Sequence, residues 1–252
     1  MAHPLADYLA LIDALIAAGW RLRPVRDAFA APARPPFAYL RHDVDRRPYR
    51  AVTMAEAEAR RGVHASYYFR CNARGRFPAA AMQRIAALGH ETGFHYECLS
   101  RCRGDADAAL RRFGEELELC RRIVPVETVA PHGAPLSAAS NMDFAAGIGP
   151  ERFGLLGDAT GLDLSDVLYV TDTGGTFGSP HNLRDRSAGP MLTAPVHPRR
   201  LFAYLIDSGT RRVVLSCHPE RWPAGRLGLA QAASRDLATN VAKLLASRYR
   251  GR

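Results

Sequence analysis

The sequence is nearly without lysine: of its 34 basic residues only Lys243 is a lysine, and the rest are arginines. The arginines occur in scattered pairs and form no basic stripe with interleaved aromatic residues, so the net charge of +9 does not indicate nucleic-acid binding. An anionic substrate accounts for part of this positive charge better than a nucleic acid does. We therefore expect no nucleic-acid partner.

Long apolar runs and cysteine motifs are also lacking. No uninterrupted apolar stretch approaches the ~18–20 residues of a membrane span. Asp7 and Asp13 interrupt the apolar N-terminal stretch, which has no basic start typical of a signal peptide. The five cysteines are scattered and include no CxxC pair, so they do not favour a cysteine-bound metal. We expect a cytoplasmic protein without a membrane span.

Three nucleotide-binding and catalytic motifs are missing as well. The sequence has no GxSxG elbow, no P-loop and no GxGxxG after an expected strand, which argues against serine hydrolases, nucleoside triphosphatases and dinucleotide enzymes. Its 252 residues, 47% of them hydrophobic, are enough for one large domain with a sizeable core.

Hydrophobic periodicity predicts strands that alternate with helices, and hence an α/β fold with a mostly parallel sheet. We expect a single domain over residues 1–252, with residues 1–36 as an N-terminal helix and loop and residues 227–250 as a closing helix. In such folds function collects at the C-terminal ends of the strands. The expected helices are 5–18, 49–61, 78–88 and 105–122, and the expected strands are 37–42, 64–70, 91–95, 126–130, 167–171 and 213–217.

The first of these strands ends in an acidic pair, Asp43 and Asp45. Side chains at i and i+2 of a strand share a face, so both carboxylates can point into one pocket. Close carboxylates need a metal ion, a proton or an arginine between them, and one could bind a cation while the other accepts a proton from water. Alternatively, Asp45 could cap the helix that starts near residue 49. The pair alone leaves both interpretations open.

Two further strand ends carry histidines. His95 and Glu97 are again i and i+2, and this donor set suits a borderline cation such as zinc. His132 precedes Gly133, whose backbone can approach a ligand closely, so His132 is either a third metal ligand or a plain turn residue. His90 directly follows a helix stop and is more simply structural.

The last two strand ends supply Asp172 and His218. A histidine at one strand end and a carboxylate on a neighbouring strand are the arrangement of an oriented general acid. Five successive strand ends that each carry Asp, His or Glu together indicate an active site.

In their order along the chain these motifs resemble the polysaccharide deacetylase superfamily, carbohydrate esterase family 4. The resemblance covers about residues 37–222 and is closest to a divergent branch of oligosaccharide deacetylases of surface-polysaccharide biosynthesis clusters. It implies a distorted (β/α)7-type barrel that uses a bound divalent metal, usually zinc, to remove N-acetyl groups from an amino sugar of an oligo- or polysaccharide or its precursor. The matching stretches are Arg-His-Asp-Val-Asp (41–45), Ser-Tyr-Tyr-Phe (66–69), Gly-His-Glu-Thr-Gly-Phe-His (89–95), Pro-His-Gly (131–133), Asp-Thr (172–173) and His-Pro (218–219).

The resemblance also implies roles in the reaction. Asp43 is similar to the general base that activates water, and His218 to the general acid that protonates the leaving amine, with Asp172 as its carboxylate partner. A backbone N–H near His132 or Gly133 stands where the family stabilises the oxyanion.

For the metal, Asp45 resembles the aspartate ligand and His95 the first histidine ligand. The family's second metal histidine lies four residues after the first, and this position is Leu99 here. His132 is our first candidate to replace it, and Glu97 is the second.

The family also has an arginine in its third motif that tethers the base, and residues 128–131 supply none. We expect Arg41 and Arg70 near the rim of the pocket, where one of them holds an anionic sugar or a phosphate.

Two other functions stay open from the sequence. One is a hydrolase of a non-sugar amide on the same fold. The other, motivated by Leu99, is a catalytically degenerate barrel that binds glycans. In each case the partner is a small-molecule or oligosaccharide substrate.

Overall fold

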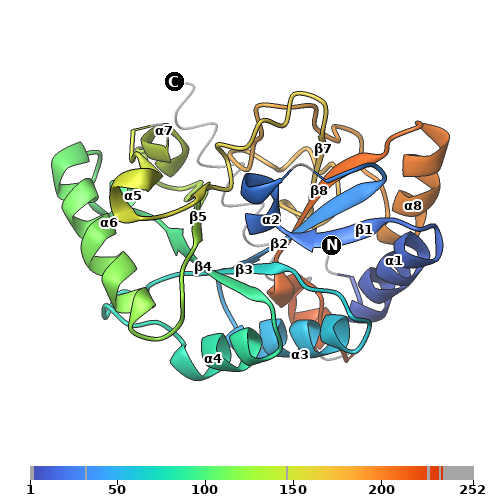
Figure 1. The fold of residues 1–252 in the computed structure, drawn as a ribbon, viewed down its shortest axis with the longest axis horizontal. Helices are drawn as coiled ribbons and strands as arrows, with labels where there is room; N and C mark the ends of the chain where they lie inside the picture. Colours follow the sequence, from blue (N-terminus) through green and yellow to red (C-terminus); the bar gives the residue numbers. More distant parts are fainter. Residues whose placement is uncertain (1–2, 32, 146, 226–227, 233, 235–252) are drawn as a thin grey trace.

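A curled parallel sheet lies at the centre of the computed structural model, with helices around its outside (Figure 1). The structure describes residues 3–31, 33–145, 147–225, 228–232 and 234. The strands follow the order β6-β5-β4-β3-β2-β8-β7, and β1 pairs with β2 off this path. This confirms the predicted α/β fold of the distorted (β/α)7-barrel type. The strands are β1 (Arg21–Pro24), β2 (Phe37–Val44), β3 (Ser66–Phe69), β4 (Glu91–Tyr96), β5 (Thr128–Pro131), β6 (Gly157–Asp158), β7 (Leu168–Thr171) and β8 (Arg212–Cys217).

The outer helices α1, α3, α4, α6 and α8 surround the sheet in Figure 1. The first four match predicted helices to within one or two residues at each end. None of the described helices is long and apolar enough to cross a membrane. The helices are α1 (Leu5–Ala17), α2 (Arg26–Ala30), α3 (Pro48–Ala59), α4 (Ala79–Ala87), α5 (Cys98–Arg101), α6 (Ala106–Arg121), α7 (Asn141–Ala145) and α8 (Pro198–Asp207), with 3-10 turns at Pro150–Phe153 and Pro219–Arg221.

Several elements differ from the sequence-based expectation. Residues 1–36 contain the strand β1 and the short helix α2 in addition to the expected helix and loop. α8 was not predicted, although Pro198 at its first position and the His197 side chain, which accepts a hydrogen bond from the Arg199 backbone N–H, are both start signals. The closing helix expected at 227–250 lies almost entirely outside the described residues.

The two faces of the sheet bury different clusters. On β2, Ala38, Leu40 and Val44 belong to the large core between the sheet and the helices, whereas Phe37 and Tyr39 belong to a smaller core on the inner face. Because side chains alternate along a strand, the next inner positions of β2 are residues 41 and 43. Polar groups therefore follow the inner core toward the C-terminal ends of the strands.

The same alternation applies to the neighbours of β2. Tyr68 of β3, Ala130 of β5 and Val214 of β8 lie in the inner core, so residues 70, 132 and 218 follow on the same face. On β4 the inner position next to Tyr68 is Gly93, where a Cβ atom would lie 2.5 Å from the Tyr68 ring. The absence of a side chain at Gly93 thus allows the strands to pack tightly beneath the site.

Candidate active site

A cavity of about 390 Å³ opens at the C-terminal ends of the inner strands. It brings together predicted site residues that are up to 175 positions apart, from Asp43 to His218. Asp172 lies behind His218, and Arg41 lies beneath Asp43. The predicted residues that line the cavity are Asp43, Asp45, Arg70, His95, Glu97, His132, Gly133 and His218.

Asp43 is held by Arg41, two residues earlier on the same face of β2. The Nε and one Nη atom of Arg41 each donate to a different carboxylate oxygen of Asp43, both at 2.8 Å, and the two side chains are 3% and 4% exposed. Burial acts to raise the pKa of Asp43, but Arg41, followed by His95, outweighs it and lowers that pKa. The carboxylate is therefore ionised and fixed in orientation, as a general base requires.

Arg41 was expected at the rim of the pocket, in contact with substrate, but it lies buried against Asp43. Its guanidinium is buried and also donates to the Tyr169 hydroxyl at 3.4 Å. Arg41 thus holds Asp43 from within β2.

His95 presents its Nε2 atom to both carboxylates. Its Nδ1 lies 3.0 Å from the Ala130 carbonyl oxygen, which can only accept, so Nδ1 carries the proton and Nε2 the lone pair. Nε2 lies 3.7 Å from Asp43 Oδ2 and 3.6 Å from Asp45 Oδ1. Burial lowers the pKa of His95 to about 4, so the ring is neutral at pH 7 and can bind a cation.

His132 approaches the same Asp45 oxygen. Its Nε2 lies 3.5 Å from Asp45 Oδ1, and its Nδ1 lies 3.1 Å from Glu97 Oε2. Glu97 is ion-paired with Arg70 and Arg101, so it holds the side of His132 that faces away from Asp45. His132 therefore lies between Asp45 and Glu97, but its Nδ1 makes no hydrogen bond with a described residue.

Asp45 is not a helix cap. The residue that precedes α3 is Arg47, and no side chain caps that helix. Asp45 Oδ1 is instead buried without a hydrogen-bond partner among the described residues. Burial acts to raise the pKa of Asp45, but His132 and then His95 outweigh it and hold that pKa well below its ordinary value.

Asp45, His95 and His132 carry donor atoms of the kind that bind a divalent ion, and two of their three mutual distances suit one. Ligand atoms about 2.0–2.2 Å from a tetrahedral zinc ion lie about 3.3–3.6 Å apart, and the two distances to Asp45 Oδ1 are 3.5 and 3.6 Å. Asp45 Oδ1 has no hydrogen bond to a described residue, but Arg70 Nη1 lies 3.6 Å from it, so an ion bound there would lie close to the Arg70 charge. The three ligand atoms do not all lie within 4.8 Å of one another, so the imidazoles must close on the ion.

His218 and Asp172 form a buried pair. His218 Nδ1 lies 2.6 Å from Asp172 Oδ1, and the His218 backbone N–H donates to Oδ2 at 3.0 Å. The Trp222 indole N–H also donates to Oδ2, at 2.7 Å. Burial acts to lower the pKa of His218, but Asp172 outweighs it and raises that pKa to about 9. The imidazolium at the cavity wall is thus suited to donate a proton.

Of the remaining predicted residues, some line the cavity and some do not. Arg70 lines the cavity, but its charge is already shared between Asp45 and Glu97. Gly133 also lines the cavity. His90 is structural, as predicted: its Nδ1 accepts from the Ala65 N–H at 3.1 Å and its Nε2 lies 2.9 Å from the Ala55 carbonyl oxygen.

Sequence reasoning missed several residues at and around the site, among them Arg221, which lines the cavity and lies 3.7 Å from Asp172. Trp222 fixes Asp172 from the loop after β8, and no spacing in the sequence indicates this contact. Glu220 has a buried Oε2 without a hydrogen-bond partner among the described residues. Its burial, and then the charge of Asp45, raise its pKa to about 7. The sequence could have indicated Glu220 through its position two residues after His218.

Comparison of the chain with family models, with curated proteins and with solved structures gave no match.

Proposed function

We propose that the chain is a metal-dependent hydrolase that removes N-acetyl groups from an amino sugar of an oligo- or polysaccharide or its precursor. The observation that carries the proposal is the shared oxygen Asp45 Oδ1, which lies 3.6 Å from His95 Nε2 and 3.5 Å from His132 Nε2 beside the tethered Asp43. The motif resemblance supplies the substrate class. The enzyme is proposed to be cytoplasmic.

Asp45, His95 and His132 are the residues that would hold the ion, with zinc as the first choice. A divalent ion here supplies Lewis-acid polarisation of the amide carbonyl and makes water easier to deprotonate. Asp43 lies 3.7 Å from His95, next to these ligands, and its orientation is fixed by Arg41.

The protons move between two groups on the same cavity. Asp43 accepts the proton of the attacking water, which adds to the acetamide carbonyl. His218, charged through Asp172, donates a proton to the departing amine as the C–N bond breaks. Gly133 lies at the cavity wall, where its backbone can face the oxyanion. The products are acetate and the free amino sugar.

The proposal is tested by acetate release from N-acetylglucosamine oligomers, with protein first stripped of metal and then supplied with Zn²⁺. Asp43→Asn and His218→Ala are each expected to lower kcat by roughly 10²–10⁴-fold, the usual contribution of a general base or acid. Asp163→Asn, an exposed aspartate, is the matched control and should leave kcat unchanged.

Three outcomes discriminate between the functions. Release of acetate that needs metal and both catalytic side chains supports the proposal. Metal-dependent cleavage of simple amides but not of acetamido sugars favours a non-sugar amide hydrolase. Glycan binding without turnover, and without any effect of Asp43→Asn, favours the degenerate barrel.

A further inference from the structure

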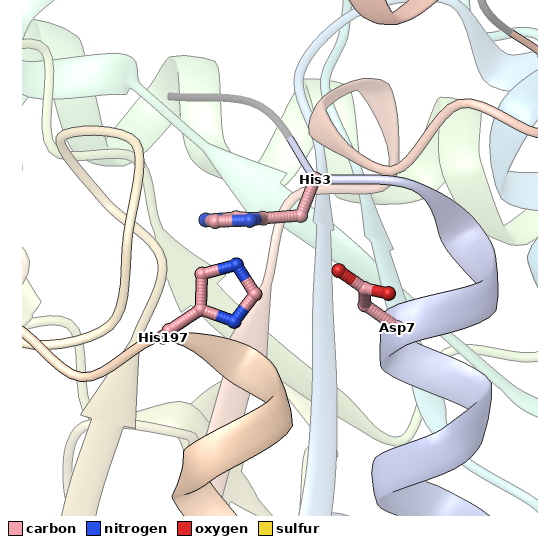
Figure 2. Close-up of side chains that lie close together, drawn as sticks. All are labelled: His3, Asp7 and His197. Carbon is pink, nitrogen blue, oxygen red and sulfur yellow. The ribbon is translucent and has the colours of Figure 1, made fainter.

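A second group of metal-ligating side chains lies outside the cavity, where the N-terminal ends of α1 and α8 meet (Figure 2). His3 precedes α1, Asp7 is in the first turn of α1, and His197 is the residue that caps α8. Their ligand atoms all lie within 4.8 Å of one another. Among the described residues, no other group of three or more His, Cys, Asp or Glu side chains is this close together. In Figure 2 the Asp7 carboxylate points toward the two rings.

One ring nitrogen of His3 lacks a hydrogen-bond partner in this position. The residue is 9% exposed, and its Nε2 is buried without a hydrogen bond to any described residue. Its ring lies at 90° to that of His197, with centroids 4.8 Å apart, and packs on Trp222 at 5.6 Å. Asp7 is 4% exposed. Buried polar atoms normally have a partner, so the Nε2 atom of His3 is expected to have one.

We propose that His3, Asp7 and His197 bind a zinc ion that ties the N-terminal segment to α8. Two imidazoles and one carboxylate are the donor set of zinc sites with three protein ligands, which leave the fourth position to water. Nitrogen donors disfavour Mg²⁺ and Ca²⁺, which prefer oxygen ligands. The site shares no residue with the one at Asp45, so it does not depend on the proposed deacetylase function.

Arg199 is the group that the ion must displace. Its Nε donates to Asp7 Oδ1 at 2.7 Å, and its backbone N–H donates to His197 Nδ1 over a long 3.3 Å. The Arg199 side chain is 70% exposed, so it returns to water at little cost when a cation replaces it. Removal of this competing charge should therefore tighten zinc binding.

The position of the site gives it a structural consequence. His3 packs on Trp222, and the Trp222 indole N–H donates to Asp172 at 2.7 Å. The His3 backbone N–H also donates to the Arg221 carbonyl at 3.2 Å. A zinc ion at His3 thus fixes the N-terminal segment against the loop that orients Asp172.

The test is a calorimetric Zn²⁺ titration of the metal-stripped full chain, with its first residues unmodified and any tag at the C-terminus. Wild type is expected to bind one zinc ion more than His197→Ala. Asp45→Ala is expected to keep one ion that the double variant, Asp45→Ala with His197→Ala, lacks. Arg199→Ala is expected to bind this ion several-fold more tightly. His64→Ala, an exposed histidine outside both groups, is the matched control and should match wild type.

The variants test the two proposed metal sites independently of each other. Equal stoichiometry of wild type and His197→Ala overturns the second site, even where Asp45→Ala loses an ion. Loss of an ion in His197→Ala but none in Asp45→Ala supports the second site and counts against the metal in the proposed function. Loss of an ion in His64→Ala as well would indicate surface binding and overturn the proposal. Thermal melting without zinc checks that each variant folds.

Discussion

Replacing Arg41 by methionine removes the guanidinium that holds Asp43 while keeping a long apolar side chain. Both hydrogen bonds of the pair are 2.8 Å long, and the two side chains are 3% and 4% exposed. The variant therefore leaves a buried carboxylate without its principal cation. Breaking a buried pair in this way costs about 3–5 kcal/mol of the free energy of unfolding.

For a domain of this size, 1 kcal/mol corresponds to about 2–4 °C in Tm, so Arg41→Met is expected to lower Tm by roughly 6–20 °C. Arg41→Lys keeps the charge but not the two-pronged geometry, so it should fall between Met and wild type. The double variant Arg41→Met with Asp43→Leu removes both charges and should recover most of the lost stability. Far-UV circular dichroism measures all three variants, with urea unfolding for the free energy and thermal melting for Tm.

The chain offers a matched control at its surface. Arg61 and Asp13 make the same two-pronged contact, at 2.6 and 3.2 Å, but their side chains are 28% and 55% exposed. Arg61→Met should cost less than about 1 kcal/mol, because solvent screens exposed pairs. If Arg41→Met costs no more than Arg61→Met, or if the double variant is less stable than Arg41→Met alone, the argument from burial is wrong.

Four further predictions concern the site and its support. Because His218 has a pKa near 9, raised by Asp172 against the effect of burial, kcat should fall as the pH rises through about 9, and Asp172→Asn should shift this fall to lower pH in a kcat–pH profile. The same pair stabilises the fold fully below pH 6.5, the ordinary pKa of histidine, and this contribution should be lost as the pH rises toward 9, measurable as a decline in Tm that His218→Ala lacks. Gly93→Ala places a Cβ atom 2.5 Å from the Tyr68 ring and should cost about 1–3 kcal/mol in urea unfolding; an unchanged midpoint would contradict the packing argument. His132→Ala should weaken zinc binding at the cavity at least tenfold by competition with a chromophoric chelator, and an unchanged affinity would remove His132 from the proposed ligands.

Most strands and the polar residues at their ends could be predicted from the sequence. Apolar strands bounded by turn residues are visible in single sequences, and parallel strands bring their C-terminal ends to one edge. Arg41 could also have been assigned to Asp43, because residues at i and i+2 of a strand share a face. The prediction that Arg41 contacts the substrate did not take this spacing into account.

Other features depend on tertiary packing and leave no local signal. Trp222 donates to Asp172 across 50 residues, which requires the loops after β7 and β8 to meet. The two-residue strand β6 is defined only by its pairing with β5. The contact of Glu97 with Arg101 has the local i,i+4 spacing of an ion pair, whereas its contact with Arg70 emerges only when β3 and β4 are assembled.

The pairing of β2 with β8 has a consequence for how the protein is made. Phe37 pairs with Arg212, 175 residues later, and Asp43 and His218 lie at the ends of these two strands. At 5–20 residues per second, a ribosome releases β8 roughly 9–35 s after β2. During that interval the nascent chain exposes one open edge of its central strand, a template for pairing with other chains. Chaperone demand during synthesis should therefore fall sharply once residue 217 has emerged.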